Sequence, residues 1–357
     1  MAETINLPDA AVAAIEQAAS RPTHAYLVVG PRGVGALDAA RGLASALIDP
    51  TRPSYVVDRV ARGRHPDVIE FEPEGVTYKL HEEVREGIIA EANRSPLESE
   101  RKVVIVLDAE RLRDDAMNAL LKTIEEPPER TVMMLVTPAP DDLLETVRSR
   151  CRRIDLPSVS DEEVEALLVE ASVDTPTAQL AASLAGGRLD RAFGFAGGAL
   201  AGVRLAFVDG LASLDGSAAA AVRAAEGLSM ALDDAVSALE AEQATELQQL
   251  ETEIEGAAYP PRTASAMRKR LTDRQKRIAR RARLDFLMEG IAAIESVHRD
   301  ALVGPDGPHR NLDRTVSTTT LDPMAGLAAC AHARRAMEHN PNEKLLLERL
   351  LMHQSGI

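Results

Sequence analysis

The chain of 357 residues contains no tryptophan, only 3% aromatic residues and just two cysteines, Cys151 and Cys330. So few aromatic side chains provide little of the stacking surface on which proteins bind single-stranded nucleic acid. Two cysteines far apart in sequence exclude a four-cysteine metal site and give no disulfide framework, so a reducing compartment is expected. No apolar run is as long as a membrane span, and the first twenty residues show no basic segment before an apolar one. These absences predict a cytoplasmic protein without a membrane role.

Positive charge is also scarce, because 41 lysines and arginines stand against 56 acidic residues, a net charge of −15. An acidic chain is a poor stand-alone DNA binder, since non-specific affinity comes from neutralising phosphates. One region departs from this balance: residues 268–283 hold nine basic residues and one acid, after eight acids and no base in 233–255. Two interpretations stay open. Either two antiparallel helices turn their opposite charges toward each other or water, or the basic stretch is a nucleic-acid patch.

The pattern of apolar residues divides the chain. Up to residue 157, short apolar runs alternate with amphipathic stretches, which is typical of a parallel sheet with crossover helices. We expect strands at 25–29, 68–71, 103–107, 132–137 and 153–156, and a helix at 115–125 stopped by two prolines. From residue 161 the strand signal ends and helices follow. The expected domains are an α/β core (1–157), a small helical lid (158–199) and an all-α C-terminal collar (200–357).

The most informative stretch is a phosphate-binding loop, at residues 26–37, that lacks its catalytic side chains. Gly30, Gly33 and Gly35 fit the frame of a G-x-x-x-x-G-K-[ST] loop between a strand and a helix. Ala36 occupies the lysine position, and Leu37 occupies the Ser or Thr position. The lysine would neutralise the β- and γ-phosphates and the hydroxyl would hold Mg²⁺, and neither a methyl nor an isobutyl group can do this. The loop predicts an ATPase scaffold that has lost its own site.

Further motifs follow one another in a definite order. They are His24-Ala25-Tyr26-Leu27, His65-Pro66-Asp67, Asn-Ala-Leu-Leu-Lys-Thr-Ile-Glu-Glu-Pro-Pro at 118–128, and Ser149-Arg150-Cys151. In this order they resemble the clamp-loader branch of the AAA+ ATPases, and within it the δ′-type subunits of bacterial DNA polymerase III. The resemblance covers the first 195 residues well and a stretch near 340–350 more weakly. It implies a P-loop AAA+ core, a lid and an oligomerising collar.

The resemblance also identifies what remains of the nucleotide site. Asp108 stands where hydrolysing relatives keep the acid that helps to hold Mg²⁺. Ala109 replaces the glutamate that orients the attacking water, and Glu110, one place further on, is expected to point elsewhere. In the lid, hydrolysing relatives carry an arginine three residues after a glycine. Counted from Gly187 this position is Asp190, although the alignment can shift by one residue. Together with the altered loop, these changes predict no intrinsic ATPase activity.

Ser149-Arg150-Cys151 is intact, in contrast to the pocket residues. In the family, this arginine reaches across a subunit interface to the γ-phosphate of ATP bound next door. A guanidinium suits that role because it is planar, permanently charged and a multiple donor. The resemblance therefore implies that Arg150 is an arginine finger acting in trans, while ATP is bound by partner subunits and this chain needs no cofactor. The alternative is that Arg150 is one of four nearby arginines that solvate an edge.

Relatives usually carry a four-cysteine zinc module before His-Pro-Asp, but residues 49–64 contain no cysteine here. A structural zinc site needs about four ligands, and His65 alone cannot provide them. We predict no zinc and, in its place, a short helix that packs through Val56, Val57 and Val60.

The function implied is that of a non-catalytic δ′-like subunit of the DNA polymerase III holoenzyme. It would help to load the sliding clamp on primed DNA during replication, with the ATP-hydrolysing γ/τ subunits and the δ subunit as partners. Clamp and primed DNA would be reached through the complex. Two alternatives remain: a working γ/τ-type ATPase, and a direct DNA-binding accessory protein that uses residues 268–283.

Overall fold

The computed structural model describes residues 7–257, 259–304, 306–314, 322–337, 339 and 341–356. The chain divides into two compact units. Unit 1 comprises Met1–Leu167, Gly187–Asp190 and Ala258–Lys269, and unit 2 comprises Leu168–Gly186, Arg191–Ala257 and Arg270–Ile357. The helices expected for the lid are shared between the two units, and the domain boundaries at 157 and 199 remain a prediction.

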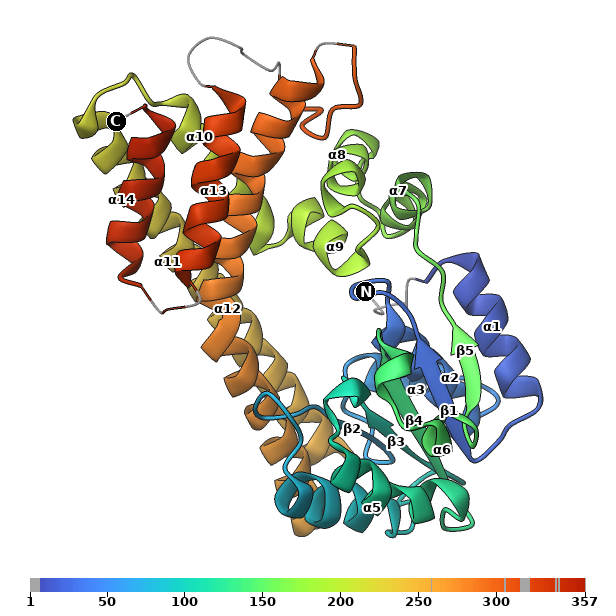
Figure 1. The fold of residues 1–357 in the computed structure, drawn as a ribbon. Helices are drawn as coiled ribbons and strands as arrows, with labels where there is room; N and C mark the ends of the chain where they lie inside the picture. Colours follow the sequence, from blue (N-terminus) through green and yellow to red (C-terminus); the bar gives the residue numbers. More distant parts are fainter. Residues whose placement is uncertain are drawn as a thin grey trace. The chain divides into compact units, whose positions relative to one another are not determined.

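Unit 1 contains a five-stranded sheet in which every neighbouring pair of strands is parallel (Figure 1). The strands are β1 (Ala25–Val29), β2 (Val68–Phe71), β3 (Lys102–Val106), β4 (Thr131–Thr137) and β5 (Arg152–Asp155), in the order β2-β3-β4-β1-β5. All five expected strands are present, and none of their ends is displaced by more than one residue. Strands β1, β3 and β4 are buried along their whole length, which explains their continuous apolar runs.

Both faces of this sheet are covered, because successive side chains of a strand point to opposite faces. Leu27, Val104 and Met133 share one hydrophobic core with the helical segments η1 and α5, and α2 packs on β1, β3 and β4. The helices are α1 (Asp9–Ser20), α2 (Ala36–Ile48), α3 (Ser54–Ala61), the π-helical η1 (Leu80–Ile89) with α4 (Ala90–Ala92), α5 (Asp114–Glu125) and α6 (Glu145–Arg148). Two 3₁₀ turns, η2 (Ala109–Arg111) and η3 (Pro140–Asp142), complete the set. The predicted α/β core with a parallel sheet is confirmed.

The His-Pro-Asp motif ties the loop before β3 to the start of β2. The Asp67 carboxylate accepts hydrogen bonds from the backbone N–H groups of Leu97, Glu98 and Ser99 at 2.5, 2.9 and 2.8 Å. His65 is buried, with Nε2 3.1 Å from Oε1 of Glu98. Burial, reinforced by the positive charge of Arg59, lowers the pKa of His65 to about 4. The motif therefore has a structural role, because it fixes the loop before β3 to the start of β2.

The expected short helix before this motif is α3. Val56 and Val60 are buried in it, while Val57 is half-buried. From the same helix, Arg59 pairs with Glu98 and contacts the hydroxyl of Tyr259.

Unit 2 is helical, as the second part of the sequence predicts. Its helices are α8 (Thr175–Ala185), α10 (Ala199–Ala212), α11 (Ala218–Ala257), α13 (Pro323–Met337) and α14 (Glu343–Gln354). Three more helices, α7 (Asp161–Glu170), α9 (Leu189–Gly197) and α12 (Pro261–Val303), cross the unit boundary. The core of unit 2 includes Phe207, Leu228, Ile291 and Leu347. Gly290 lets α12 approach Phe207 of α10 closely, because a Cβ at position 290 would lie 2.5 Å from the Phe207 ring. The surface loop expected at 303–320 is confirmed at 304 and 306–314, while residues 305 and 315–320 lie outside the described residues.

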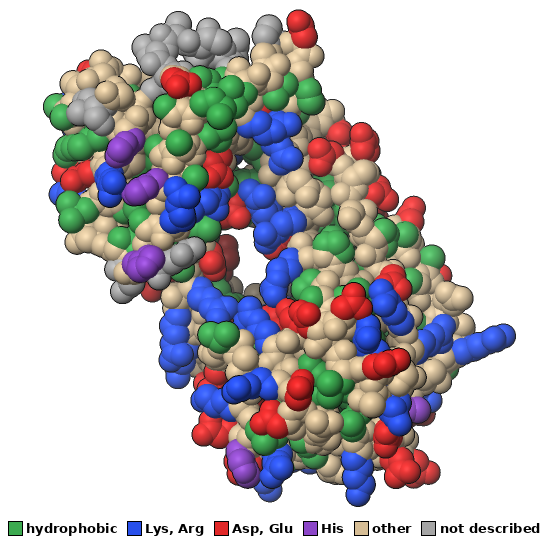
Figure 2. Space-filling model, viewed as in Figure 1, with side chains coloured by type: hydrophobic (Ala, Val, Ile, Leu, Met, Phe, Trp, Pro, Cys, Tyr) green, Lys and Arg blue, Asp and Glu red, His purple; other side chains and the backbone are tan. Residues whose placement is uncertain are grey.

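The oppositely charged segments lie on the long helices α11 and α12, which run antiparallel to each other within unit 2. Arg274 pairs with Glu246, and Arg283 with Asp233, so the interpretation of facing charges is confirmed at these positions. Lys276 is exposed on the same helix. Figure 2 shows acidic and basic side chains interspersed on the visible face of the molecule.

Within the described ranges, no single helix is long and apolar enough to span a membrane; only α9 and α10 taken together reach that length and composition, with a 74° bend between them.

Candidate functional site

The loop between β1 and α2 keeps the backbone of a phosphate-binding loop. Gly33 and Gly35 both have φ = +85°, a conformation that side chains other than glycine rarely adopt. A Cβ on Gly33 would lie 2.5 Å from Oδ1 of Asp190, and one on Gly30 would lie 3.0 Å from Cβ of Leu156. The glycines are therefore required by the turn itself, whether or not a phosphate is ever bound.

The first turn of α2 offers a phosphate no cationic or hydroxyl side chain. Ala36 and Leu37 occupy these positions, and Asp38 follows them. Burial raises the pKa of Asp38, and this effect outweighs the lowering by Arg41; Glu70 and Asp190 raise it further. An acid in this turn opposes the attraction that a helix N-terminus has for anions.

Arg32, a residue of this loop, lies beside the carboxylates of Asp108 and Glu110. Arg32 Nη1 lies 3.3 Å from Oδ1 of Asp108, and its Nη2 donates to Oε1 of Glu110 at 2.9 Å. Oε2 of Glu110 accepts a hydrogen bond of 2.9 Å from Thr137 at the end of β4. A guanidinium thus stands against the acid that would help to hold Mg²⁺ in a hydrolysing relative.

The expectation that Glu110 points elsewhere is wrong. Asp108 adopts the left-handed conformation, with φ = +47°, and η2 follows it as a tight turn. This turn brings Glu110 back toward Arg32 and Thr137, while the Ala109 side chain is buried. No residue pattern indicated this position of Glu110, because the direction of a side chain after a strand depends on the backbone conformation of the residue before it.

Lid residues lie directly over the loop. The backbone N–H of Leu189 donates to the carbonyl oxygen of Gly33 at 2.7 Å. Arg188 and Asp190 form an ion pair at 2.6 Å, and both contact the position that a Gly33 Cβ would occupy. Asp190 stands at the position where the alignment expected the lid arginine. It lies at the loop as a carboxylate that is already paired with Arg188.

Arg150 and the phosphate-binding loop lie at opposite ends of the strands of the sheet. In the parallel pairing of β1 with β5, Arg152 is opposite Tyr26 and Asp155 is opposite Val29. Arg150 therefore precedes the amino end of β5, whereas the phosphate-binding loop follows the carboxyl end of β1. At about 3.3 Å per residue, the strands alone separate the two by roughly 10 Å.

The surroundings of Arg150 hold it at the surface. Its side chain is 41% exposed, forms an ion pair with Glu125 at the end of α5, and donates to the Thr146 carbonyl oxygen at 2.9 Å. Ser149 donates to the same carbonyl oxygen at 3.4 Å. Burial raises the pKa of Cys151 to about 12, so its thiol is a packing group and not a nucleophile. Glu125 lies in the expected 118–128 motif, but only the structure shows that it anchors Arg150.

Residues 10–160 match the family model described as DNA polymerase III, delta subunit. This part of the chain is therefore similar to that family and to several DNA polymerase III delta′ subunits. Among named relatives, the DNA polymerase III subunit delta′ of Bacillus subtilis is 32% identical over 170 residues, 46% of this chain and 51% of the relative. The DNA polymerase III subunit gamma of Buchnera aphidicola (Acyrthosiphon pisum) is 35% identical over 163 residues, 43% of this chain and 44% of the relative.

The chain therefore spans about half the length of the clamp-loader relatives that it matches. A solved structure of a DNA polymerase III gamma subunit-related protein from Thermotoga maritima aligns over 95% of this chain and 98% of its own, with 20% identity and a TM-score of 0.45. Both delta′ and gamma or tau subunits occur among the named relatives.

Proposed function

We propose that this chain is a δ′-type clamp-loader subunit that does not hydrolyse ATP and that donates Arg150 to the ATP site of a neighbouring γ/τ-type subunit. The observation that carries this proposal is the contrast between the two edges of one sheet. At the carboxyl edge, Ala36 and Leu37 replace the phosphate- and metal-binding side chains, and Arg32 occupies the remaining carboxylates. At the amino edge, Arg150 is exposed and anchored.

The partners follow from the same proposal. An arginine that cannot reach its own loop needs a nucleotide on another subunit, and γ and τ subunits occur among the relatives. A δ subunit would complete the loader, which would place the sliding clamp on primed DNA. No zinc and no nucleotide of its own are needed for this role.

The test uses the full chain in a loader reconstituted with its γ/τ and δ partners. Arg150→Ala is expected to leave assembly intact and to slow turnover at the site it serves by about 10³-fold, the lower range for fingers acting in trans. Arg153→Ala is the matched control, since Arg153 is a nearby exposed arginine that pairs only with Asp155 in the described part of the chain. Unchanged ATP hydrolysis in the Arg150 variant would reject the finger role.

The alternative of a working γ/τ-type ATPase is tested on the isolated chain. It requires a cation and a hydroxyl at positions that hold Ala36 and Leu37, so we expect no turnover above a blank reaction. Robust hydrolysis by the isolated chain would favour this alternative over the δ′-type role.

The alternative of direct DNA binding through residues 268–283 is weakened by ion pairing. Arg274 and Arg283 face acidic residues of α11 and, for Arg283, also Glu343. A salt-dependent DNA titration of the isolated chain tests it, because phosphate contacts weaken steeply as salt rises.

A further inference from the structure

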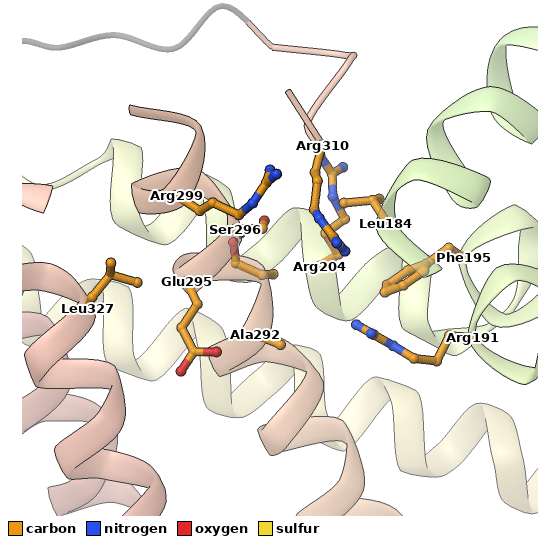
Figure 3. A pocket seen from close by; sticks show the side chains of 11 residues that line it. Leu184, Arg191, Phe195, Arg204, Ala292, Glu295, Ser296, Arg299, Arg310 and Leu327 are labelled. Atoms are coloured by element: carbon orange, nitrogen blue, oxygen red, sulfur yellow. Dashed lines mark hydrogen bonds between the residues drawn. The ribbon is translucent and has the colours of Figure 1, made fainter. Parts of the chain in front are cut away.

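Unit 2 contains a pocket of about 320 Å³ that plays no part in the proposed role (Figure 3). It lies between α9, α10, α12 and the loop that follows α12, and all its lining residues belong to unit 2. Four arginines line it: Arg191, Arg204, Arg299 and Arg310. Pockets of about 300 Å³ and above are of the size that holds small-molecule ligands.

Arg204 is fixed at the wall of this pocket before any ligand arrives. Its side chain is 4% exposed, and its two terminal nitrogens bind Asp313 at 2.6 and 2.9 Å and Asn311 at 2.8 Å. Its third donor, Nε–H, is buried and has no hydrogen-bond acceptor within the described residues. A buried donor without an acceptor is costly, and an anion in the pocket is one group that could satisfy it.

Two more arginines are presented by the loop after α12. Asp300, which is fully buried, accepts hydrogen bonds from the backbone N–H of Arg310 at 3.0 Å and of Asn311 at 2.8 Å. Arg299 Nη1 is held by Asp300 at 3.1 Å and by the Pro308 carbonyl oxygen at 3.2 Å. The Arg310 guanidinium lies beside Gly186 and forms no ion pair with any described carboxylate. Figure 3 shows Arg204, Arg299 and Arg310 gathered on one side of the pocket, with Arg191 and Phe195 facing them.

The pocket has one positive charge that no described carboxylate pairs, that of Arg310, because Arg191, Arg204 and Arg299 each have an acidic partner. Glu295 is the one acidic residue among those lining it, and Arg334 binds both of its carboxylate oxygens, at 2.7 and 2.8 Å. Arg191 is paired with Glu289 and stacks over Phe195. Much of the remaining wall is apolar, which suits a ligand with an anionic end and an uncharged body.

We propose that this pocket binds a small phosphate-bearing molecule, of pyrophosphate to nucleotide size. Arg299 and Arg310 bind its phosphate oxygens, and Nε–H of Arg204 donates a further hydrogen bond to it. Guanidinium groups suit this ligand because their planar forks match the geometry of phosphate oxygens. The proposal is independent of the clamp-loader role, since neither the phosphate-binding loop nor Arg150 takes part.

The test is calorimetric titration of the full-length chain with pyrophosphate and, separately, with ADP. We expect saturable binding of one equivalent, and comparing the two probes shows whether the phosphate alone suffices. The double variant Arg299→Ala/Arg310→Ala should weaken this binding by roughly 100-fold, since each removes a charge-assisted hydrogen bond. Arg335→Ala, which removes an exposed charge of unit 2 outside the pocket, should leave it unchanged.

A second variant tests whether the double arginine variant loses binding only because its structure is disturbed. Ala292→Trp fills the pocket without altering any charge, and it should also abolish binding while circular dichroism stays that of the parent. The proposal is overturned if neither probe binds the parent chain, if Ala292→Trp binds as the parent does, or if Arg335→Ala weakens binding as much as the double variant.

Discussion

Arg32 Nη1 lies 3.3 Å from Oδ1 of Asp108, so the carboxylate retained from the nucleotide site faces a guanidinium of the same chain. Arg32 also binds Glu110 at 2.9 Å. A cation of the protein thus stands against the acidic residues with which a hydrolysing relative would hold Mg²⁺. If the loop is a former nucleotide site, as we propose, it lacks the expected cationic and hydroxyl side chains, and the acids beside it are already paired.

Restoring the lost side chains alone should not restore Mg²⁺-nucleotide binding. We expect Ala36→Lys/Leu37→Thr to bind Mg²⁺-ATP weakly, because Arg32 still pairs with Asp108. Adding Arg32→Ala should strengthen binding by about tenfold, roughly the effect of removing one of the two arginines that pair with Asp108, the other being Arg111. Titration with a fluorescent ATP analogue measures this, and tight binding by the first variant without the Arg32 change would contradict it.

Glu125 should act as the anchor of Arg150. Glu125→Gln keeps the shape of the side chain and removes the ion pair, so the arginine loses its fixed position but not its charge. Because the pair is partly exposed, we expect a loss of about 0.4–1 kcal/mol, which is about two- to fivefold slower ATP hydrolysis in the reconstituted loader. A loss as large as that of Arg150→Ala would instead show that Glu125 acts on the nucleotide site directly.

Stability should fall in mild acid because of His65. Burial lowers its pKa from about 6.5 to about 4, so the folded chain favours the neutral ring. The resulting stability is fully present above pH 6.5 and is lost as the pH falls toward 4; a shift of this size corresponds to about 3 kcal/mol. His65→Asn, which can still accept from the Asp67 N–H, should lose less between pH 7 and 4.5. Denaturant unfolding of both proteins at the two pH values checks this, and equal losses would contradict it.

Asp67 should matter for stability more than an exposed acid does. Its carboxylate accepts three backbone hydrogen bonds, and Asp67→Ala leaves those N–H groups without their acceptor. We expect a loss of about 3 kcal/mol in the free energy of unfolding, within the range for hydrogen bonds to a charged group. Asp141→Ala, at a 91% exposed side chain, is the control and should change it by less than about 1 kcal/mol. Urea denaturation measures both.

Neither cysteine should react readily in the folded chain. Burial raises the pKa of both Cys151 and Cys330 to about 12, so the thiolate fraction at pH 8 is about 10³ times smaller than for a thiol with an ordinary pKa of 9.0. Alkylation by iodoacetamide, followed by mass spectrometry, should be slow in buffer and fast in denaturant. Rapid labelling of Cys151 in buffer would show that it is accessible and ionised.

The amino-acid sequence determined the arrangement of strands and helices and showed which side chains the phosphate-binding loop lacks. All five strands were predicted to within one residue at each end. For β1, β3 and β4 the signal was a nearly continuous apolar run, because a strand buried on both faces has no polar alternation. The glycines of the loop and the absence of side-chain chemistry at Ala36 and Leu37 were equally visible, since they depend only on residue identity and spacing.

Tertiary structure alone decided which side chains meet. Arg32 pairs with residues 76 and 78 positions away, and Glu110 turns back because Asp108 has a positive φ. Strand register placed Arg150 at the opposite edge of the sheet from the loop, and chain packing brought four arginines to one pocket in unit 2. Local sequence sets backbone preferences over a few residues, whereas these contacts arise only when distant elements pack together.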